Sequence, residues 1–255
     1  MPIDFEYSNE CKNLSGFSEK RTKNSSYKIM ENFLDLKDHS SILYFTHEPK
    51  SYLNWPHAPA QFFPLKCPYS DLKIQFPDLY KLIQNKANTE FFFHFTRIVT
   101  EGDETKKINY IAHEFQHAIQ YIKHKKIYYY CMIIEYFLCK DLNKEQRLIV
   151  KVRLPHEYDA LRQAKIVAIS LCGKERMSEF VKQMLNNPEF PDDKPLWNQI
   201  NSIDVKKRYN LKNEALNLWK FHKIEQKIEA LKMKQNICCN DRIIIKMYDH
   251  ANLND

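Results

Sequence analysis

The chain has 255 residues, enough for one large domain or two small ones with a sizeable core. Its content of 44% hydrophobic and 28% charged residues is ordinary for a globular protein. It has only three glycines, Gly16, Gly102 and Gly173, so no glycine-rich phosphate loop or dinucleotide-binding fingerprint can be assembled. Nucleotide-binding folds built on those loops are therefore disfavoured.

The formal net charge of +7 can indicate a polyanionic partner, but the lysines are spread along the chain. Basic runs are short, as at residues 123–126 and 206–208, and such runs are more typical of solvated faces than of a nucleic-acid interface. Nucleic acid stays as a weakly supported partner. The sequence gives no indication of the oligomeric state.

Seven cysteines are an odd number, and they form no C-x-x-C pair, which favours reduced thiols and a cytoplasmic location. The first residues include Asp4 and Glu6 and no apolar run, so we expect no signal peptide. Delivery outside the cell by a non-classical route stays open. The longest apolar run, from Ile127 to Leu138, contains Glu135 and is too short to span a membrane.

In chain order, residues 1–30 are polar and rich in Ser, Asn and Lys, and we expect a poorly ordered segment there. Five prolines between residues 50 and 80 exclude a long helix, so this part should be irregular and packed on the domain. Residues 90–99 (EFFFHFTRIV) are aromatic and β-branched and predict a strand.

Helices are predicted for the rest of the chain. Residues 104–125 carry one apolar stripe at i, i+3, i+4 spacing, formed by Ile108, Ile111, Phe115, Ala118, Ile119 and Ile122. Residues 127–139 favour a buried helix, 155–172 a helix that starts at Pro155 and stops at Gly173, and 211–234 an amphipathic helix. We therefore predict one domain over 31–180 and a mainly helical C-terminal region over 181–255, packed on the same domain.

The sequence His113-Glu114-Phe115-Gln116-His117 lies inside the predicted helix 104–125. Residues i and i+4 share one helix face, so two imidazoles can bind one metal ion, for which zinc is the natural choice. The intervening Glu114 can then act as base toward a metal-activated water. The two histidines project opposite the apolar stripe, as expected for a helix buried on one side and facing a cleft on the other. The alternative is a solvated helix face with two ordinary histidines.

A catalytic zinc usually has three protein ligands. Glu157 is the best third candidate, because 100° per residue places its carboxylate in the apolar stripe of helix 155–172, where an uncompensated charge is costly. The same count points Asp159 toward solvent and puts His156 at the edge of the stripe. Complementing the helix dipole is the alternative role of Glu157. His124 lies two turns beyond the motif and would be too far from the metal.

His113-Glu114-x-x-His117 followed on a later helix by Glu157-x-x-Ala160 resembles the zincin metallopeptidases, specifically the gluzincin-like groups with a downstream Glu ligand. The resemblance covers about residues 90–172 and implies an α+β fold with a small mixed sheet and an edge strand beside the active-site helix. That edge would pair with extended substrate, and the strand at residues 90–99 is the expected one. Some such families have Asp four residues after the ligand Glu, where this chain has Leu161.

Such a site also needs a group that stabilises the oxyanion of the tetrahedral intermediate. His156, Tyr121 and Tyr158 are the candidates, and the sequence does not choose among them. His94, in the predicted strand, is interpreted as a core residue.

We therefore expect a hydrolase that cleaves peptide or protein substrates, with one catalytic zinc held by His113, His117 and Glu157 and with Glu114 as general base and then acid. Two other functions stay open: a catalytically silent zincin-like binding or sensing module, and a basic nucleic-acid-associated protein.

Overall fold

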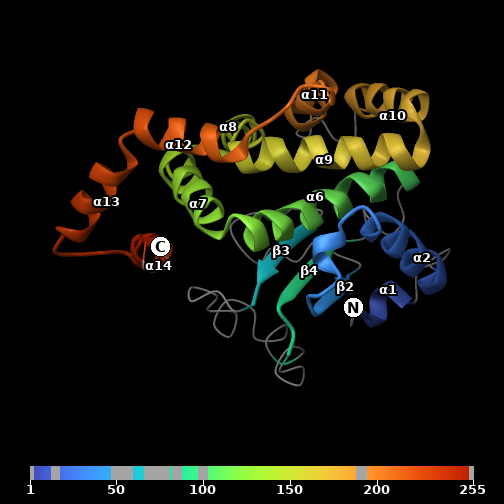
Figure 1. Cartoon of the computed structure of the whole chain (residues 1–255), viewed down its shortest axis with the longest axis horizontal. Helices are drawn as coiled ribbons and strands as arrows, with labels where there is room; N and C mark the ends of the chain where they lie inside the picture. The colour runs from blue at the N-terminus through green and yellow to red at the C-terminus, as the bar shows by residue number, and fades with distance from the viewer. Residues whose placement is uncertain are drawn as a thin grey trace. The chain divides into compact units, whose positions relative to one another are not determined.

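A computed structural model describes residues 3–12, 18–46, 60–65, 81, 88–96, 103–187 and 194–252. These residues form a mixed α/β structure with one four-stranded sheet (Figure 1). The elements in chain order are β1 (Ile3–Tyr7), α1 (Asn9–Lys12), α2 (Glu19–Met30), the 3-10 turn η1 (Leu34–Leu36), β2 (Ser41–Phe45), β3 (Ala60–Pro64), β4 (Phe91–Phe95), α6 (Glu104–Lys123), α7 (Lys125–Cys139), α8 (Lys144–Lys151), α9 (Pro155–Cys172), α10 (Lys174–Asn186), α11 (Lys194–Ser202), α12 (Leu211–Phe221), α13 (Ile224–Lys232) and α14 (Cys239–Asn252).

The chain forms two compact units. The first contains residues 1–119 and 163–177, and the second contains residues 120–162 and 178–255. Helices α6 and α9 are each continuous, and each contributes residues to both units. The predicted division into residues 31–180 and 181–255 stays a prediction.

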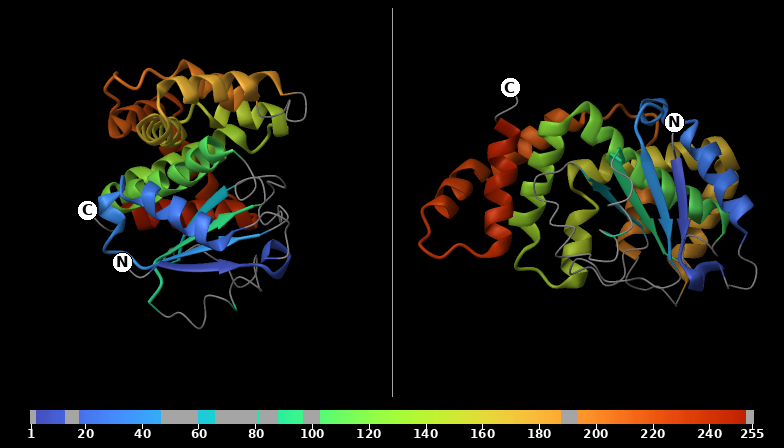
Figure 2. Two further views of the ribbon diagram at one scale, coloured as in Figure 1. Left: turned by 90° about the vertical axis from the view of Figure 1, so that its right-hand side faces the viewer. Right: turned by 90° about the horizontal axis from the view of Figure 1, so that it is seen from below.

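The sheet belongs to the first unit and has the strand order β1-β2-β4-β3. β1 pairs parallel with β2 and β2 parallel with β4, whereas β3 pairs antiparallel with β4. Every residue of β4 (FFFHF) is buried, because phenylalanines fill both of its faces. Figure 2 shows α6 crossing one face of the sheet.

Phe115 joins α6 to the sheet and to the chain before β2. Its ring packs edge-on against Phe93 of β4 at a centroid distance of 5.0 Å and against Phe33 at 5.7 Å. Edge-to-face aromatic pairs add stabilisation beyond the apolar area that they bury. The predicted apolar stripe of this helix is thus the side that anchors it on the sheet.

Three sequence expectations for the first unit change. The strand predicted at residues 90–99 is observed as β4, but it lies inside the sheet and is not an edge strand. The proline-rich segment contains β3, which is an outer strand of the described sheet and ends at Pro64, as suits an edge position. Residues 1–30, expected to be poorly ordered, include β1 and α2. The other residues of 50–80 lie outside the described ranges.

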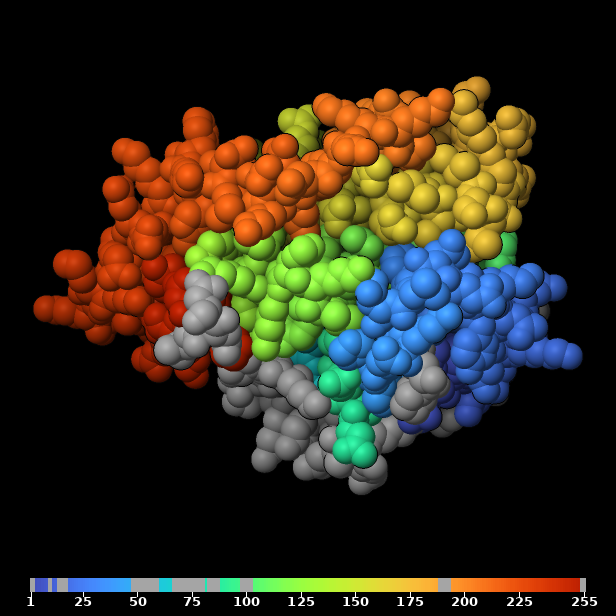
Figure 3. Space-filling model, viewed as in Figure 1, coloured from blue at the N-terminus to red at the C-terminus, as the bar shows by residue number. Residues whose placement is uncertain are grey.

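The second unit is helical in its described residues, and α7 packs against α8, α12 and α14. Tyr130 of α7 stacks on Trp219 of α12 at 4.1 Å, and Trp219 stacks on Tyr248 of α14 at 6.1 Å. The single helix predicted for 211–234 is two helices, because Lys223 adopts a left-handed conformation with φ 50° between α12 and α13. In Figure 3 these two helices, in orange, lie at the molecular surface.

The helices predicted at residues 104–125, 127–139 and 155–172 are confirmed as α6, α7 and α9. Among the described residues no helix is long and apolar enough to cross a membrane. The described cysteines are free thiols: Cys11, Cys131, Cys139, Cys172, Cys238 and Cys239. The cytoplasmic location stays a prediction.

Gly173 ends α9 with φ +89°, and a β-carbon built there would meet no atom within 4 Å. Gly173→Ala should therefore lower the free energy of unfolding only through the left-handed backbone, by about 1 kcal/mol. Urea denaturation measures this loss, with exposed Lys174→Ala as the control that stays within about 0.5 kcal/mol of the wild type. An unchanged stability of Gly173→Ala would contradict the left-handed cap.

Candidate metal centre

Helix α6 is buried along most of its length, including the side that carries the histidines. Glu114 and His117 are each 7% exposed, and His113 is half-buried. The expectation of one buried side and one open side is therefore wrong in part, because both sides of the helix are covered. The alternative of a solvated helix face with two ordinary histidines is also contradicted by this burial.

The two histidines of the motif point their rings at one another. Their Nε2 atoms are 3.0 Å apart, and the rings lie edge to face with an interplanar angle of 89°. A spacing of four residues on a continuous helix produces this approach, since it puts both side chains on one face a turn apart. The same atoms can therefore turn toward one ion.

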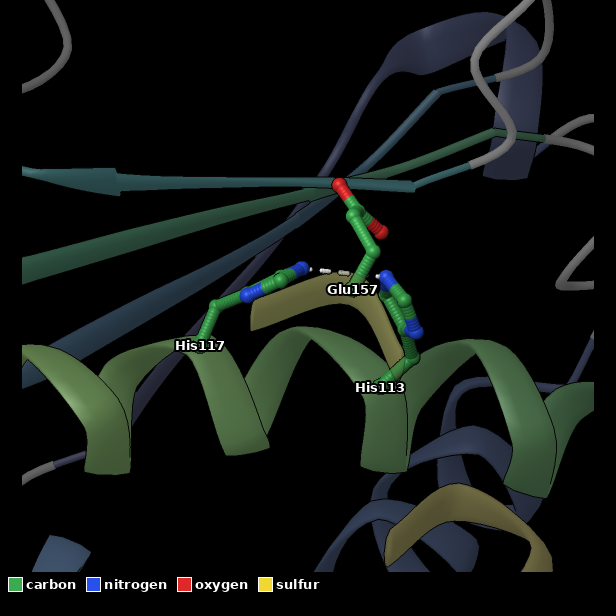
Figure 4. Close-up of side chains that lie close together, drawn as sticks. All are labelled: His113, His117 and Glu157. Carbon is green, nitrogen blue, oxygen red and sulfur yellow. Dashed lines mark hydrogen bonds between the residues drawn. The ribbon is translucent and has the colours of Figure 1, made fainter. Parts of the chain in front are cut away.

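Glu157 completes this pair (Figure 4). One ligand atom from each of His113, His117 and Glu157 lies within 4.8 Å of the others, so the group could hold a metal ion. Glu157 is on the first turn of α9, and the residue is 6% exposed. The prediction that its carboxylate is buried is confirmed.

The fully buried amide of Gln120 holds the first turn of α9 next to α6. Its Nε2 donates to the backbone carbonyl oxygen of His156 at 2.9 Å and to Oδ2 of Asp159 at 2.9 Å. Gln120 follows His117 by three residues, and the two acceptors stand on either side of Glu157. The expectation that Asp159 points to solvent is wrong, because Gln120 reaches its carboxylate.

A second group of possible ligands shares Glu157. Glu135 of α7, His156 and Glu157 also place one ligand atom each within 4.8 Å of the others. Here the ammonium of Lys151 already lies between the carboxylates, 3.1 Å from Glu157 Oε1 and 3.6 Å from Glu135 Oε1. A lysine in that position attracts both buried carboxylates and balances one of their two negative charges. This second group is therefore an ion-paired cluster.

Glu135 is ionised in this cluster. Burial by itself raises the pKa of the Glu135 carboxyl, but the charge of Lys151 and the hydrogen bond from His156 lower it below its ordinary value of 4.5. His156 Nε2 is 3.1 Å from Glu135 Oε2 and 3.7 Å from Glu157 Oε1. Lys151 and His156 thus both lie beside the same oxygen of Glu157.

The candidates for oxyanion stabilisation have other contacts. His156 is engaged with Glu135, as above. Tyr121 lies among aromatic residues, with its hydroxyl 3.5 Å from that of Tyr129. Tyr158 packs on Tyr209 at a centroid distance of 4.7 Å. These contacts leave the oxyanion group unassigned.

The two remaining histidines considered from sequence have structural positions. His94 is buried in β4, and its Nε2 is 2.8 Å from the hydroxyl of Thr46, in agreement with a core role. His124 is exposed at the N-terminal cap of α7. It belongs to neither group of possible ligands found among the described residues.

Sequence reasoning missed Gln120, Lys151 and the role of Glu135. For Glu135 there was a signal, since it is the one carboxylate within an otherwise apolar helix. Gln120 sits at i+3 from the second histidine, which puts it on the same side of α6. Lys151 gave no signal, because it follows an ordinary amphipathic segment.

No protein-family model, curated protein or solved structure matches this chain.

Lys151→Met should destabilise the protein, because it leaves the buried carboxylates of Glu135 and Glu157 without their cation. We expect a loss of about 3 kcal/mol in the free energy of unfolding. Lys232→Met is the matched control: its ion pairs with Glu229 and Asp249 are largely exposed, so the loss should stay below about 1 kcal/mol. Equal losses in the two variants would contradict the compensating role of Lys151.

The stability should also depend on pH through Glu135. Its pKa is lower in the folded chain than in the unfolded one, so ionised Glu135 stabilises the fold above pH 4.5 and that contribution is lost as the pH falls below this value. In Lys151→Met the pKa of Glu135 rises, and the slope of unfolding free energy against pH between 3 and 5 (roughly the range of carboxyl titration) should become shallower. Urea denaturation across this range tests it, and an unchanged slope would refute it.

Proposed function

We propose that this chain is a zinc-dependent peptidase in which His113, His117 and Glu157 hold one zinc ion and Glu114 serves as general base and then acid. The observation that carries the proposal is that two imidazole nitrogens and one buried carboxylate oxygen lie within 4.8 Å of one another, with Glu114 between the two histidines in the sequence.

The donor set suits zinc. Two histidines and one carboxylate are a frequent combination at catalytic zinc sites, which keep a fourth position open. Zinc–nitrogen bonds of 2.0–2.1 Å in a tetrahedral arrangement require nitrogens about 3.3 Å apart. The two Nε2 atoms are 3.0 Å apart, so a small rotation of either ring brings them to that separation.

Glu114 is the residue that we propose for proton transfer. It follows His113 directly on the same helix and is buried, so bulk water competes little for its carboxylate. Zinc bound here would supply a Lewis acid that lowers the pKa of a water toward about 7. Glu114 then takes the proton of the attacking water and returns it to the departing amine.

β3 is the strand that we propose for substrate pairing. It lies at one end of the described sheet and pairs with β4 along one of its edges. An extended peptide can add to such an edge through main-chain hydrogen bonds. This replaces the original expectation, in which the strand at residues 90–99 served as the edge.

Metal content and peptide hydrolysis test the site together. Purified without chelators, the wild type should contain one zinc per chain, and His113→Ala and Glu157→Gln should lose it. Glu114→Gln should keep the zinc and lose hydrolysis of a quenched fluorescent peptide library by about 100-fold to 10,000-fold, the usual share of a general base.

Glu135→Gln and His94→Ala are the matched controls. Glu135 is a buried carboxylate of the neighbouring cluster, and His94 is a buried histidine in the same unit as the motif. Both variants should keep the metal. Zinc in Glu157→Gln at the wild-type level would move the third ligand elsewhere, and a wild type without zinc would refute the proposal.

A further inference from the structure

We propose that Gln120 is the positioning residue of the metal centre: its two hydrogen bonds fix Glu157 at the distance from His117 that lets the three ligands bind one ion. The inference rests on the proposed zinc site and goes beyond it, since Gln120 itself binds no metal. Three observations carry it, namely the place of Gln120 on α6, its acceptors and its burial.

Its place on α6 links Gln120 to the histidines. It follows His117 by three residues on a continuous helix, so the two side chains leave neighbouring turns about 4.5 Å apart along the axis. A hydrogen bond from Gln120 therefore restricts the position of its acceptor relative to His117 to a narrow range.

Its acceptors enclose the third ligand. One hydrogen atom of the amide nitrogen goes to the carbonyl oxygen of His156, directly before Glu157, and the other to the carboxylate of Asp159, two residues after it. Both donors of the amide are thereby used on the first turn of α9. A shift of this turn along α6 would lengthen one of these bonds and would move Glu157 by the same amount.

The burial of Gln120 makes its two hydrogen bonds costly to break, so the position of its acceptors is restricted. Gln120 is 1% exposed, so water does not replace a lost bond at low cost. Metal ligands tolerate deviations of only about 0.2 Å in bond length. Residues that orient ligands through hydrogen bonds accordingly change metal affinity by about 10-fold to 100-fold when they are replaced.

Asn109 offers a matched control on the same helix. It is also a buried amide, one turn before His113, and its Nδ2 donates to the carbonyl oxygen of Thr105 at 2.8 Å and to Sδ of Met177 at 3.5 Å. None of these acceptors belongs to the turn that carries Glu157. Asn109→Leu therefore removes a buried amide close to the motif without releasing the third ligand.

The experiment compares zinc dissociation constants, measured on the full chain by competition with a chromophoric chelator, for the wild type, Gln120→Met and Asn109→Leu. Gln120→Met should weaken zinc binding by about 10-fold to 100-fold, and Asn109→Leu by less than about 3-fold, the scale of indirect effects between sites without shared partners. Urea denaturation of the metal-free proteins shows whether the two losses of stability are comparable. Visible absorption of the cobalt-substituted proteins reports the coordination geometry and should change in Gln120→Met alone.

A reversed pair gives a second test that does not depend on the folding of Gln120→Met. Gln120→Glu places a carboxylate against that of Asp159 and should weaken zinc binding. Adding Asp159→Asn supplies an amide donor from the other side and should restore part of the affinity. Absence of any rescue would overturn the assignment.

The remaining outcomes separate this inference from the proposed function. If the wild type binds zinc and Gln120→Met binds it equally tightly, Gln120 has no positioning role and the zinc site stands. If Gln120→Met and Asn109→Leu weaken binding to the same extent, the effect is general destabilisation, and the inference fails. A wild type without zinc refutes both.

Discussion

The buried polar side of α6 is the constraint on which the rest of the centre depends. A helix that carries Glu114, His117 and Gln120 inside the protein must find hydrogen bonds or charges for each of them, because an unpaired buried polar group costs about 1–3 kcal/mol. Gln120 meets that need with two acceptors on α9. The same turn of α9 brings Glu157, whose charge is met in turn by Lys151. The burial of Gln120 thus requires its acceptors on α9, and the burial of Glu157 requires the charge of Lys151.

Glu157 belongs to both groups of possible ligands, and its neighbours differ between the two groups. Glu135 is ionised and pairs with Lys151, and the Lys151 ammonium also contacts one oxygen of Glu157. The histidines of α6 meet Glu157 from another helix. The Lys151 ammonium also supplies positive charge to the group formed by Glu135, His156 and Glu157. That group therefore does not require a metal ion to supply it.

The features that the sequence predicted correctly are those that follow from helical periodicity. The apolar stripes of α6 and α9 gave both helices, and the phase of Glu157 gave its burial. The helical phase of a residue predicts the direction of its side chain but not the residue that the side chain contacts. It therefore predicted a solvent-facing Asp159, whereas Gln120 donates a hydrogen bond to the Asp159 carboxylate. The end of α12 at Lys223 was not predicted because no Gly or Pro marks it in the sequence. The position of β4 inside the sheet was not predicted because strand order depends on pairings between distant segments.

The aromatic stack of the second unit has an optical consequence. Trp219 lies between Tyr130 and Tyr248, and Trp197 packs edge-on against Phe180, so both described tryptophans belong to that unit. The described strands of the sheet in the first unit contain phenylalanine and tyrosine but no tryptophan. In a Trp55→Phe variant, emission comes from these two indoles alone and therefore follows the melting of the helical unit, whereas far-ultraviolet dichroism follows the whole chain. A difference between the two transitions would show that the units unfold one after the other.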